Sequence, residues 1–253
     1  MPRFSLRGLV LLLTLLGGFS SRAAVAPRPT LFIVGDSTAS NGADRGWGSH
    51  LGKFFDATKI NVVNRARAGR SSRTFQAEGL WEKVLADMKA GDFVLVQFGH
   101  NDGGPLVERP GRGSLKGFGE ETQEITTADG QKEVVHAYGW YLRKYASDAR
   151  AKGATPLFLS LTVRNEWPGG KVERGSGRFV DLTDIIADRY EAMGQAKVKE
   201  FFPQDHMHTT AAGAELNASL VVAGIKGLKD TPLAEKLSAK GKEVEAATSS
   251  VAR

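Results

Sequence analysis

The sequence contains no cysteine. This absence excludes disulfide bonds, catalysis by a thiol and metal sites built from thiolates, and it is compatible with an exported enzyme of bacterial type. The stability of the folded chain must therefore come from packing. With 253 residues, of which 41% are apolar and 25% are charged, the chain is long enough for one well-buried core, and we expect one domain.

Long apolar runs are scarce as well. The stretch from Leu9 to Phe19 is too short for a membrane-spanning helix, which needs about 20 residues. It follows Arg3 and Arg7 and precedes small residues up to Ala26, which is the pattern of a secretory signal peptide. We therefore expect residues 1–26 to be a cleaved leader, the mature protein to be secreted or periplasmic, and no stable membrane anchor to remain.

Excess charge of either sign is small. The formal net charge is +6, but residues 1–26 hold three arginines and no acidic residue, so the remaining chain carries +3. A surplus of this size is not the basic footprint of a nucleic-acid-binding protein. We expect no nucleic acid partner, and we expect the mature chain to be monomeric.

The mature chain alternates strand and helix signals, which predicts an α/β fold. Apolar runs bounded by turn residues predict strands at Leu31–Val34, Ile60–Asn64, Phe93–Phe98 and Leu157–Val163, with a short fifth strand at Phe179–Leu182. Apolar residues at helical spacing predict helices within residues 47–55, 80–88, 137–151, 185–193 and 209–228. Residues 229–253 are mixed in charge and predict a poorly ordered tail, so the domain is expected to span residues 27–228.

Polar clusters follow three of the predicted strands, and a fourth cluster lies near the carboxyl terminus. They are Gly35–Thr38, the turn around Gly69, Gly99–Gly104 and Asp205–His208. Because ligands of open α/β sheets bind at the carboxyl ends of the strands, we expect these clusters to form one site.

Together these clusters contain the parts that acyl transfer by a serine requires. Ser37 is the candidate nucleophile, His208 the base that takes its proton, and Asp205 the acid that orients this base. The Asp-x-x-His spacing allows both residues to share one loop. The Gly69 amide and the Asn101 side chain are candidate donors to the developing oxyanion.

Each residue taken singly also has a purely structural interpretation. Asp36 and Ser37 are residue types that cap helices, and Asn101 and Asp102 are types that form Asx turns. Gly69 is one turn glycine among thirty glycines, and His206 and His208 fit a surface position equally well.

Two alternative functions use the same residues differently. In the first, Asp205, His206 and His208 bind a divalent metal together with His100 or Asp102, and the protein is a metal-assisted hydrolase. In the second, the protein is a carbohydrate-binding module without chemistry, in which tryptophans are stacking platforms for sugars. The candidate tryptophans are Trp47, Trp140 and Trp167.

The order of the four clusters resembles the SGNH, or GDSL-type, hydrolases, and among them the rhamnogalacturonan acetylesterases. The resemblance covers about residues 30–228. It is carried by Gly35–Thr38, Phe98–Gly104 and Asp205–Thr209, with further likeness at Tyr138–Arg143. Gly-Asp-Ser alone is a weak signal, whereas the four blocks in this order are a strong one.

The resemblance implies a three-layer α/β/α sandwich with a five-stranded, mainly parallel sheet. It also implies a triad of Ser37, Asp205 and His208, and an oxyanion hole made by the Ser37 and Gly69 amides and the Asn101 side chain, with neither metal nor cofactor. His206 inherits no role. The chain departs from the family between the fourth and fifth strands, because residues 164–178 are too short and glycine-rich for the peripheral helix expected there.

The implied substrate is an acetylated polysaccharide, first of all acetylated rhamnogalacturonan. The polar residues 105–132 are expected to form one wall of a shallow cleft, and their basic side chains, with Arg70 and Arg73, are predicted to attract galacturonate carboxylates. The alternative is a solvated, mobile loop of balanced charge. Acetylated xylan, another carbohydrate ester, a cell-surface glycan or a lipid ester are the competing substrates.

Overall fold

A computed structural model describes residues 27–173, 181–228 and 231–247. The expected leader, residues 1–26, lies outside these ranges. Among the described residues, no helix combines the length and the apolar character needed to cross a bilayer.

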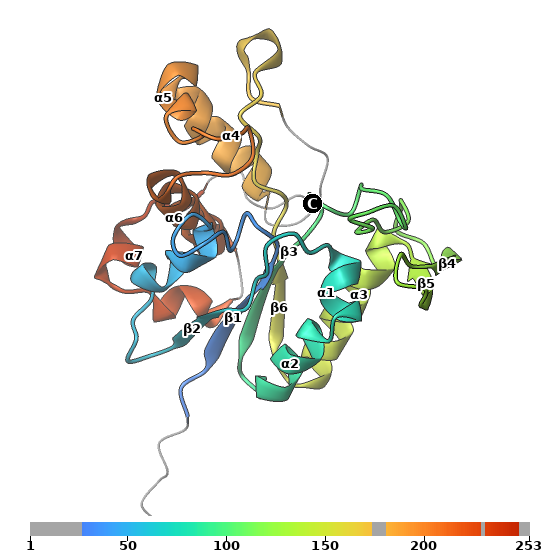
Figure 1. Ribbon diagram of the computed structural model, residues 1–253. Coiled ribbons are helices and arrows are strands. Elements are labelled where there is room, and N and C mark those ends of the chain that lie inside the picture. The colour runs from blue at the N-terminus through green and yellow to red at the C-terminus, as the bar shows by residue number, and fades with distance from the viewer. Residues whose placement is uncertain (1–26, 174–180, 229–230, 248–253) are drawn as a thin grey trace, which may run out of the picture.

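A parallel sheet of four strands forms the centre of the described molecule (Figure 1). Its order is β2 (Asn61–Asn64), β1 (Thr30–Gly35), β3 (Phe93–Gln97) and β6 (Thr155–Phe158). Every neighbouring pair is parallel. The two inner strands are apolar almost throughout, because a parallel sheet is covered on both faces.

Helices cover both faces of the sheet, which confirms the predicted three-layer α/β architecture. One face carries α1 (Ser72–Ala77), α2 (Leu80–Asp87) and α3 (Tyr138–Ala151). The other carries α4 (Leu182–Met193), α5 (Gln195–Lys199), α6 (Ala211–Gly227) and α7 (Ala239–Glu243).

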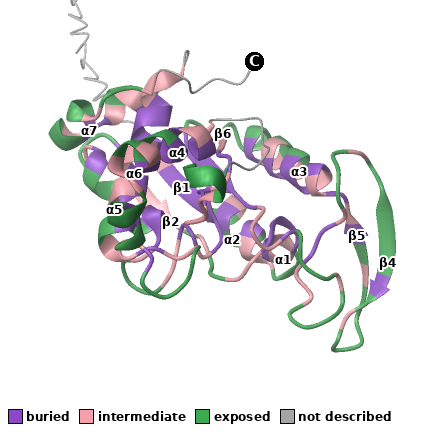
Figure 2. Ribbon diagram, turned by 90° about the horizontal axis from the view of Figure 1, so that it is seen from above, coloured by how far each residue is buried: buried purple, intermediate pink, exposed green. Residues whose placement is uncertain are grey.

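Alternate residues of the inner strands divide the core into two halves. Leu31, Ile33, Phe93 and Leu95 pack with α4 and α6, whereas Phe32, Val34, Val94 and Val96 pack with α1, α2 and α3. This follows from the two-residue period of a strand, whose successive side chains point to opposite faces. Figure 2 shows the buried strands between their partly exposed helices.

The structure departs from the sequence prediction at the predicted helix within residues 47–55. Two short 3-10 helices, η1 (Trp47–Ser49) and η2 (Leu51–Phe54), replace it. The predicted apolar face is nevertheless buried, since Trp47, Leu51, Phe54 and Phe55 are each at most 4% exposed.

The number of strands also differs from the expected five. Residues 179–180 of the predicted fifth strand lie outside the described ranges, while Asp181 caps α4 and Leu182 is its first residue. Asp181 accepts a hydrogen bond from the Asp184 amide, which favours a helix start over a strand here. The described part of residues 164–178 holds only a 3-10 turn, η3 (Pro168–Gly170).

The predicted tail is ordered over residues 231–247, so this prediction was wrong there. The segment forms η4 (Pro232–Lys236) and α7. Leu233 and Leu237 are buried in the core beside η2, and Leu237 bridges to Phe55. Burial of the Leu233 and Leu237 side chains in the core stabilises this segment in spite of its mixed charge. Residues 229–230 and 248–253 lie outside the described ranges.

The expected loop 105–132 contains part of a β-hairpin, which the sequence analysis did not predict. Strands β4 (Thr122–Thr126) and β5 (Lys132–His136) pair in antiparallel register and project from the sheet beyond α3 (Figures 1 and 2). The strands are mostly polar and exposed, and only Ile125 and Val135 carry buried apolar side chains. So little apolar periodicity gives a weak strand signal.

Candidate active site

Ser37 lies in the turn that follows the carboxyl end of β1, as predicted. Its neighbours Asp36 and Thr38 are buried, while Ser37 itself is only half-buried. Gly35 allows this turn to begin close to β3, since a Cβ there would lie 2.8 Å from the Gln97 carbonyl oxygen. The turn therefore holds Ser37, half-buried, at the edge of the sheet.

The structure brings Ser37 together with the loop that precedes α6. The Ser37 Oγ lies 2.9 Å from Nε2 of His208, and Nδ1 of His208 lies 2.7 Å from Oδ2 of Asp205. Serine, histidine and aspartate thus form a continuous hydrogen-bonded chain, in the order that a serine nucleophile, its base and the orienting acid require.

Hydrogen bonds on both sides hold the Asp205–His208 loop in place. The Thr209 hydroxyl donates to the Arg45 carbonyl on the segment after the nucleophile, and the Asn165 amide donates to the His206 carbonyl. Thr210 then caps α6 by accepting from the Gly213 amide. The loop is fixed at its middle and at its end, which fixes the position of the His208 ring.

Asp205 is held as a carboxylate. Its Oδ1 accepts from the Met207 and His208 amides, both at 2.7 Å, while Oδ2 faces the His208 ring. Burial pushes the pKa of Asp205 upward, but the hydrogen bonds from the His208 ring and from these amides outweigh it and bring this pKa to about 2. Asp205, ionised at neutral pH, can fix the His208 tautomer and stabilise the ring when it gains a proton.

The predicted oxyanion donors lie on the turns after β2 and β3. Gly69 adopts φ +78°, which favours glycine, and its carbonyl accepts from the Arg112 Nη1 at 3.1 Å. Neither the Ser37 nor the Gly69 amide donates a hydrogen bond to any residue that the structure describes. The Asn101 Nδ2 donates to the Arg70 carbonyl at 2.9 Å, which occupies one of its two hydrogens.

The side chains of Asp36 and Asp102 are buried next to the candidate site. Asp36 is completely buried, and its Oδ1 accepts from the Thr38 amide and hydroxyl, while its Oδ2 has no hydrogen-bond partner among the described residues. Asp102 accepts from the Ser72 amide and hydroxyl and from the Ser114 hydroxyl. Burial raises the pKa of each carboxyl to about 6. Asp102 therefore anchors the start of α1 rather than forming an Asx turn of its own.

Sequence reasoning missed two supporting residues, Gln97 and Tyr138. Gln97 is buried at the end of β3; its Oε1 accepts from the Thr38 hydroxyl and the Trp47 indole, and its Nε2 donates to the Ser160 carbonyl. Tyr138 Oη donates to the Phe98 carbonyl at 2.6 Å. The available signal for Gln97 was a polar residue inside an otherwise apolar strand, since a buried polar group requires partners.

The remaining histidines do not join the triad. The His206 Nε2 faces Glu166 at 3.5 Å, and the His100 Nε2 faces the Thr162 hydroxyl at 3.2 Å. Burial is the main cause that lowers the pKa of His100 to about 4. Nowhere in the described ranges do three histidine, aspartate or glutamate side chains gather as a group that could hold a metal ion.

The tryptophans proposed as sugar platforms are engaged in the fold. Trp47 is 1% exposed and donates to Gln97. Trp140 stacks on His136 with ring centroids 3.7 Å apart, and the Trp167 indole donates to the Asn165 side chain. Trp47 is therefore unavailable to a ligand.

The predicted role of Arg73 in attracting carboxylates was wrong. Its side chain is 2% exposed, pairs with both carboxylate oxygens of Glu133, and donates to the Leu106 and Gly113 carbonyls. Arg70 is partly exposed and pairs with Glu78. Arg73 instead attaches the 105–121 segment and β5 to α1.

Comparison with known proteins agrees with this geometry. The family model described as GDSL-like Lipase/Acylhydrolase matches residues 31–221. A rhamnogalacturonan acetylesterase of Emericella nidulans is 33% identical over 211 residues, which cover 78% of this chain and 84% of that protein. A Bacillus subtilis protein named "probable rhamnogalacturonan acetylesterase YesY" is 30% identical over 231 residues, covering 82% and 96%.

The solved structure of the Bacillus subtilis protein YxiM shares the fold. It superposes with a TM-score of 0.62 at 21% identity, over 79% of this chain. The chain spans only 56% of the length of that structure.

Proposed function

The chain belongs to the GDSL-like lipase and acylhydrolase family and is a carboxylic ester hydrolase, and we propose that it removes O-acetyl groups from acetylated rhamnogalacturonan with Ser37 as nucleophile. The observation that carries this proposal is the chain of hydrogen bonds from Ser37 through His208 to Asp205. The two relatives named as rhamnogalacturonan acetylesterases support the substrate.

In the proposed reaction, the Ser37 Oγ attacks the acetyl carbonyl carbon while His208 Nε2 takes the hydroxyl proton. The carbonyl oxygen becomes an oxyanion, which accepts from the Ser37 and Gly69 amides and from the second Asn101 hydrogen. When the intermediate collapses, the bond to the sugar oxygen breaks and His208 returns the proton to that oxygen. The products of this half-reaction are the free sugar hydroxyl and an acetylated Ser37.

The second half-reaction uses water. His208 takes a proton from the attacking water, whose oxygen bonds to the acetyl carbon, and then returns it to Ser37 Oγ as acetate leaves. Asp205 keeps its charge throughout and balances the positive charge that forms on His208. The chain's own residues supply every proton transfer in this scheme.

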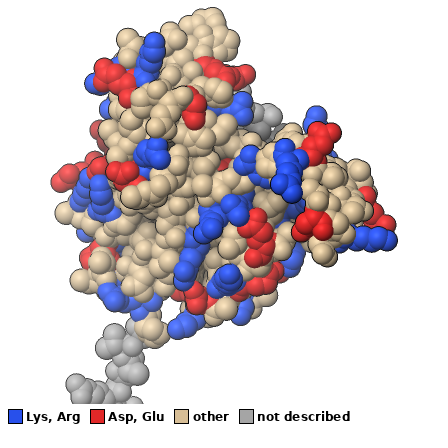
Figure 3. Space-filling model, viewed as in Figure 1, with Lys and Arg blue, Asp and Glu red and all other residues tan. Residues whose placement is uncertain are grey.

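The surroundings of Ser37 favour a polar substrate. Arg112, on the 105–121 segment, donates to the Gly69 carbonyl, so this segment lies directly beside the proposed oxyanion hole. Figure 3 shows acidic and basic side chains interspersed over the face in view. The 105–121 segment carries charged residues such as Glu108, Arg109 and Arg112, which offer hydrogen bonds and charge to a sugar chain rather than an apolar tunnel to a long acyl chain.

We further propose that residues 1–26 are a signal peptide and that the mature enzyme acts outside the cytoplasm as a monomer. The basic residues, apolar stretch and small residues of the leader support export. An acetylated polysaccharide is a substrate met outside the cell, so the proposed location and the proposed substrate agree.

The proposal is tested by measuring acetate release from acetylated rhamnogalacturonan, acetylated xylan and nitrophenyl esters of increasing chain length. We expect the rhamnogalacturonan to be the best polysaccharide substrate and acetyl to be the preferred acyl group. Faster turnover of octanoyl than of acetyl esters would instead indicate a lipolytic enzyme, and equal or faster release from xylan would indicate an acetylxylan esterase.

A further inference from the structure

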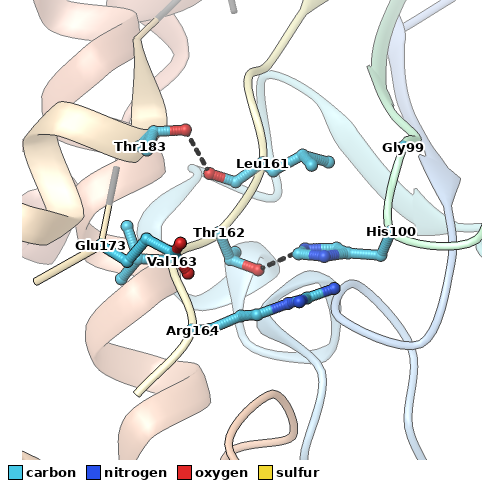
Figure 4. Close-up of a pocket in the computed structure, with 8 residues that line it drawn as sticks. All are labelled: Gly99, His100, Leu161, Thr162, Val163, Arg164, Glu173 and Thr183. Carbon is cyan, nitrogen blue, oxygen red and sulfur yellow. Dashed lines mark hydrogen bonds between the residues drawn. The ribbon is translucent and has the colours of Figure 1, made fainter. Parts of the chain in front are cut away.

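A pocket of about 240 Å³ opens beside the turn that follows β3, and the proposed acyl transfer does not use it (Figure 4). The segment after β3 contributes Gly99 and His100, and the segment after β6 contributes Thr162 and Arg164. His100 precedes the proposed oxyanion donor Asn101 in the chain, and the charge of His208 acts on His100. The pocket therefore lies within the reach of a substrate bound at Ser37.

The Arg164 side chain is a half-buried cation with no fixed partner in the part of the chain that the structure describes. Its guanidinium makes no hydrogen bond or ion pair with any described residue. Figure 4 shows it extending along the side of the pocket where the His100 ring lies. By contrast, Arg70 and Arg73 are each paired with a glutamate. A partly desolvated guanidinium without a carboxylate is a ready site for an anionic ligand.

Two acidic residues near the pocket, Glu166 and Glu173, interact with each other. The Glu166 side chain raises the pKa of Glu173, and the charge of Arg164 has a smaller effect in the opposite direction. Glu166 also faces His206 at 3.5 Å. Figure 4 shows Glu173 on the opposite side of the pocket from the end of the Arg164 side chain. Neither acid neutralises Arg164 by direct pairing.

Apart from Arg164 and Glu173, the polar side chains that line the pocket are neutral. Burial, with smaller contributions from the charges of Arg164 and His208, lowers the pKa of His100 to about 4, so its ring is uncharged at neutral pH. Its Nε2 faces the Thr162 hydroxyl, and both groups are suited to hydrogen bonds with sugar hydroxyls. Among the described residues that line the pocket, Arg164 is the cation, and its guanidinium lies at the end of the pocket away from Glu173.

We propose that Arg164 makes this pocket a subsite for a uronic acid carboxylate of the polysaccharide whose acetyl ester lies at Ser37. This inference rests on the proposed function and adds the group that distinguishes its substrate. An acetylated rhamnogalacturonan carries such a carboxylate on every galacturonate, whereas an unsubstituted xylan backbone carries none. The pocket therefore favours the anionic polysaccharide over the neutral one.

The test uses inhibitors that need not be substrates. Digalacturonate and the neutral disaccharide galactobiose are compared as competitive inhibitors of 4-nitrophenyl acetate hydrolysis, in wild type, Arg164→Gln and Arg164→Lys. In Arg164→Gln we expect the inhibition constant of digalacturonate to rise about tenfold, the loss of one charge-assisted interaction, and that of galactobiose to stay near its wild-type value. Arg164→Lys should recover part of the binding, because it keeps the charge but loses the bidentate geometry.

Arg150→Gln is the matched control. Arg150 is an exposed arginine at the last turn of α3, about 18 Å along the helix from Tyr138, and lies in a different pocket. The substitution Arg150→Gln removes the same charge from the protein as Arg164→Gln. An unchanged inhibition constant of digalacturonate in Arg150→Gln therefore shows that the effect of Arg164→Gln is local and not due to net charge. An equal loss of digalacturonate binding in Arg150→Gln would overturn the subsite.

Kinetics with the acetylated polysaccharides themselves distinguish a failure of this inference from a failure of the proposed function. The ratio of kcat/KM for acetylated rhamnogalacturonan to that for acetylated xylan should fall about tenfold in Arg164→Gln. If wild type deacetylates rhamnogalacturonan and digalacturonate inhibits wild type and Arg164→Gln equally, the subsite is wrong and the function stands. If digalacturonate inhibition depends on Arg164 but no acetate is released from rhamnogalacturonan, the subsite stands and the substrate must be another uronate ester.

Discussion

Arg73, on α1, and Glu133, on β5, form a bidentate ion pair in which the guanidinium is 2% exposed. The same guanidinium donates to the Leu106 and Gly113 carbonyls. One buried side chain thus attaches both ends of the 105–136 region to the helix that follows the Gly69 turn. Because Arg112 in this region contacts the Gly69 carbonyl, the pair also fixes one side of the active site.

Arg73→Gln should destabilise the protein by about 3 kcal/mol, because it leaves Glu133 and two carbonyls without their buried partner. Urea unfolding measures this loss, and limited proteolysis should show earlier cleavage within residues 105–136. The control is Arg65→Gln, which breaks an exposed pair with Asp87 and should cost about 0–1 kcal/mol. Equal losses in the two variants would show that the Arg73 pair does not hold this region.

Ser37→Ala should lower kcat for a small acetyl ester by about a thousandfold or more while the fold stays intact. The Ser37 hydroxyl, which faces His208 Nε2, is the nucleophile. Alanine removes this hydroxyl and leaves the other residues of the site unchanged. Steady-state kinetics and a thermal melt are the two measurements. Ser49→Ala, on an exposed residue of η1, serves as control and should keep full activity. Substantial turnover by Ser37→Ala would end the serine mechanism.

His208→Ala should abolish activity, whereas His206→Ala should change it little. Only His208 lies between Ser37 and Asp205; His206 faces Glu166 on the same loop. Asp205, with a pKa of about 2, stays ionised in mildly acidic buffers and keeps orienting the histidine base there, and His206 takes no part in this arrangement. The pH–rate profiles of wild type and His206→Ala should therefore coincide. A dispensable His208 would contradict the assignment.

Asn101→Ala should lower kcat about a hundredfold with little change in KM, because one of its Nδ2 hydrogens is free to bind the oxyanion only in the transition state. Asn64 gives the contrast. Its side chain donates to the Ala39 carbonyl and accepts from the Ala66 amide, so Asn64→Ala should lower stability rather than kcat. If Asn101→Ala raised KM and left kcat unchanged, its role would lie in binding the ground state.

Stability should fall as pH rises from about 4 to 6. Asp36 and Asp102 have pKa values near 6 in the folded protein against an ordinary 3.8, so the folded state binds protons in this window that the unfolded chain has released. Each carboxyl contributes roughly 3 kcal/mol to this decline. The pKa of His100 is lowered from 6.5 to about 4, so His100 offsets roughly 3 kcal/mol over the same window and leaves a net decline of about 3 kcal/mol. Asp205 acts in the opposite sense, but only as pH falls from 3.8 through about 2.

Asp102→Asn should remove roughly 3 kcal/mol, which is most of the net decline, since the amide is neutral at every pH. The measurement is the free energy of unfolding from urea titrations between pH 4 and pH 7. Glu78→Gln, on an exposed ion pair, serves as the control and should leave the slope unchanged. A wild-type stability that rises over this pH range would show that the two carboxyls are not held protonated.

The sequence by itself determined those features that are written within short segments. The apolar runs at Leu31–Val34 and Phe93–Val96 could only be stable when covered on both faces, so they identified the central strands and the α/β class. Asp205 and His208 lie three residues apart, so a single loop turn suffices to join them. The polar clusters after the strands marked the edge of the sheet at which the site forms.

The tertiary structure alone decided what depends on partners distant in the sequence. Ser37 and His208 are 171 residues apart, and their 2.9 Å contact exists because β1 and α6 pack into one core. Three further features depend on such partners: the polar hairpin, the burial of Arg73 and the ordering of residues 231–247. The local sequence at each of them has too little apolar periodicity to predict it. The sequence alone does not distinguish a paired arginine from an unpaired one. Arg73 is paired with Glu133, whereas Arg164 pairs with no described residue. The difference arises because burial and pairing depend on the atoms that the fold places around each side chain.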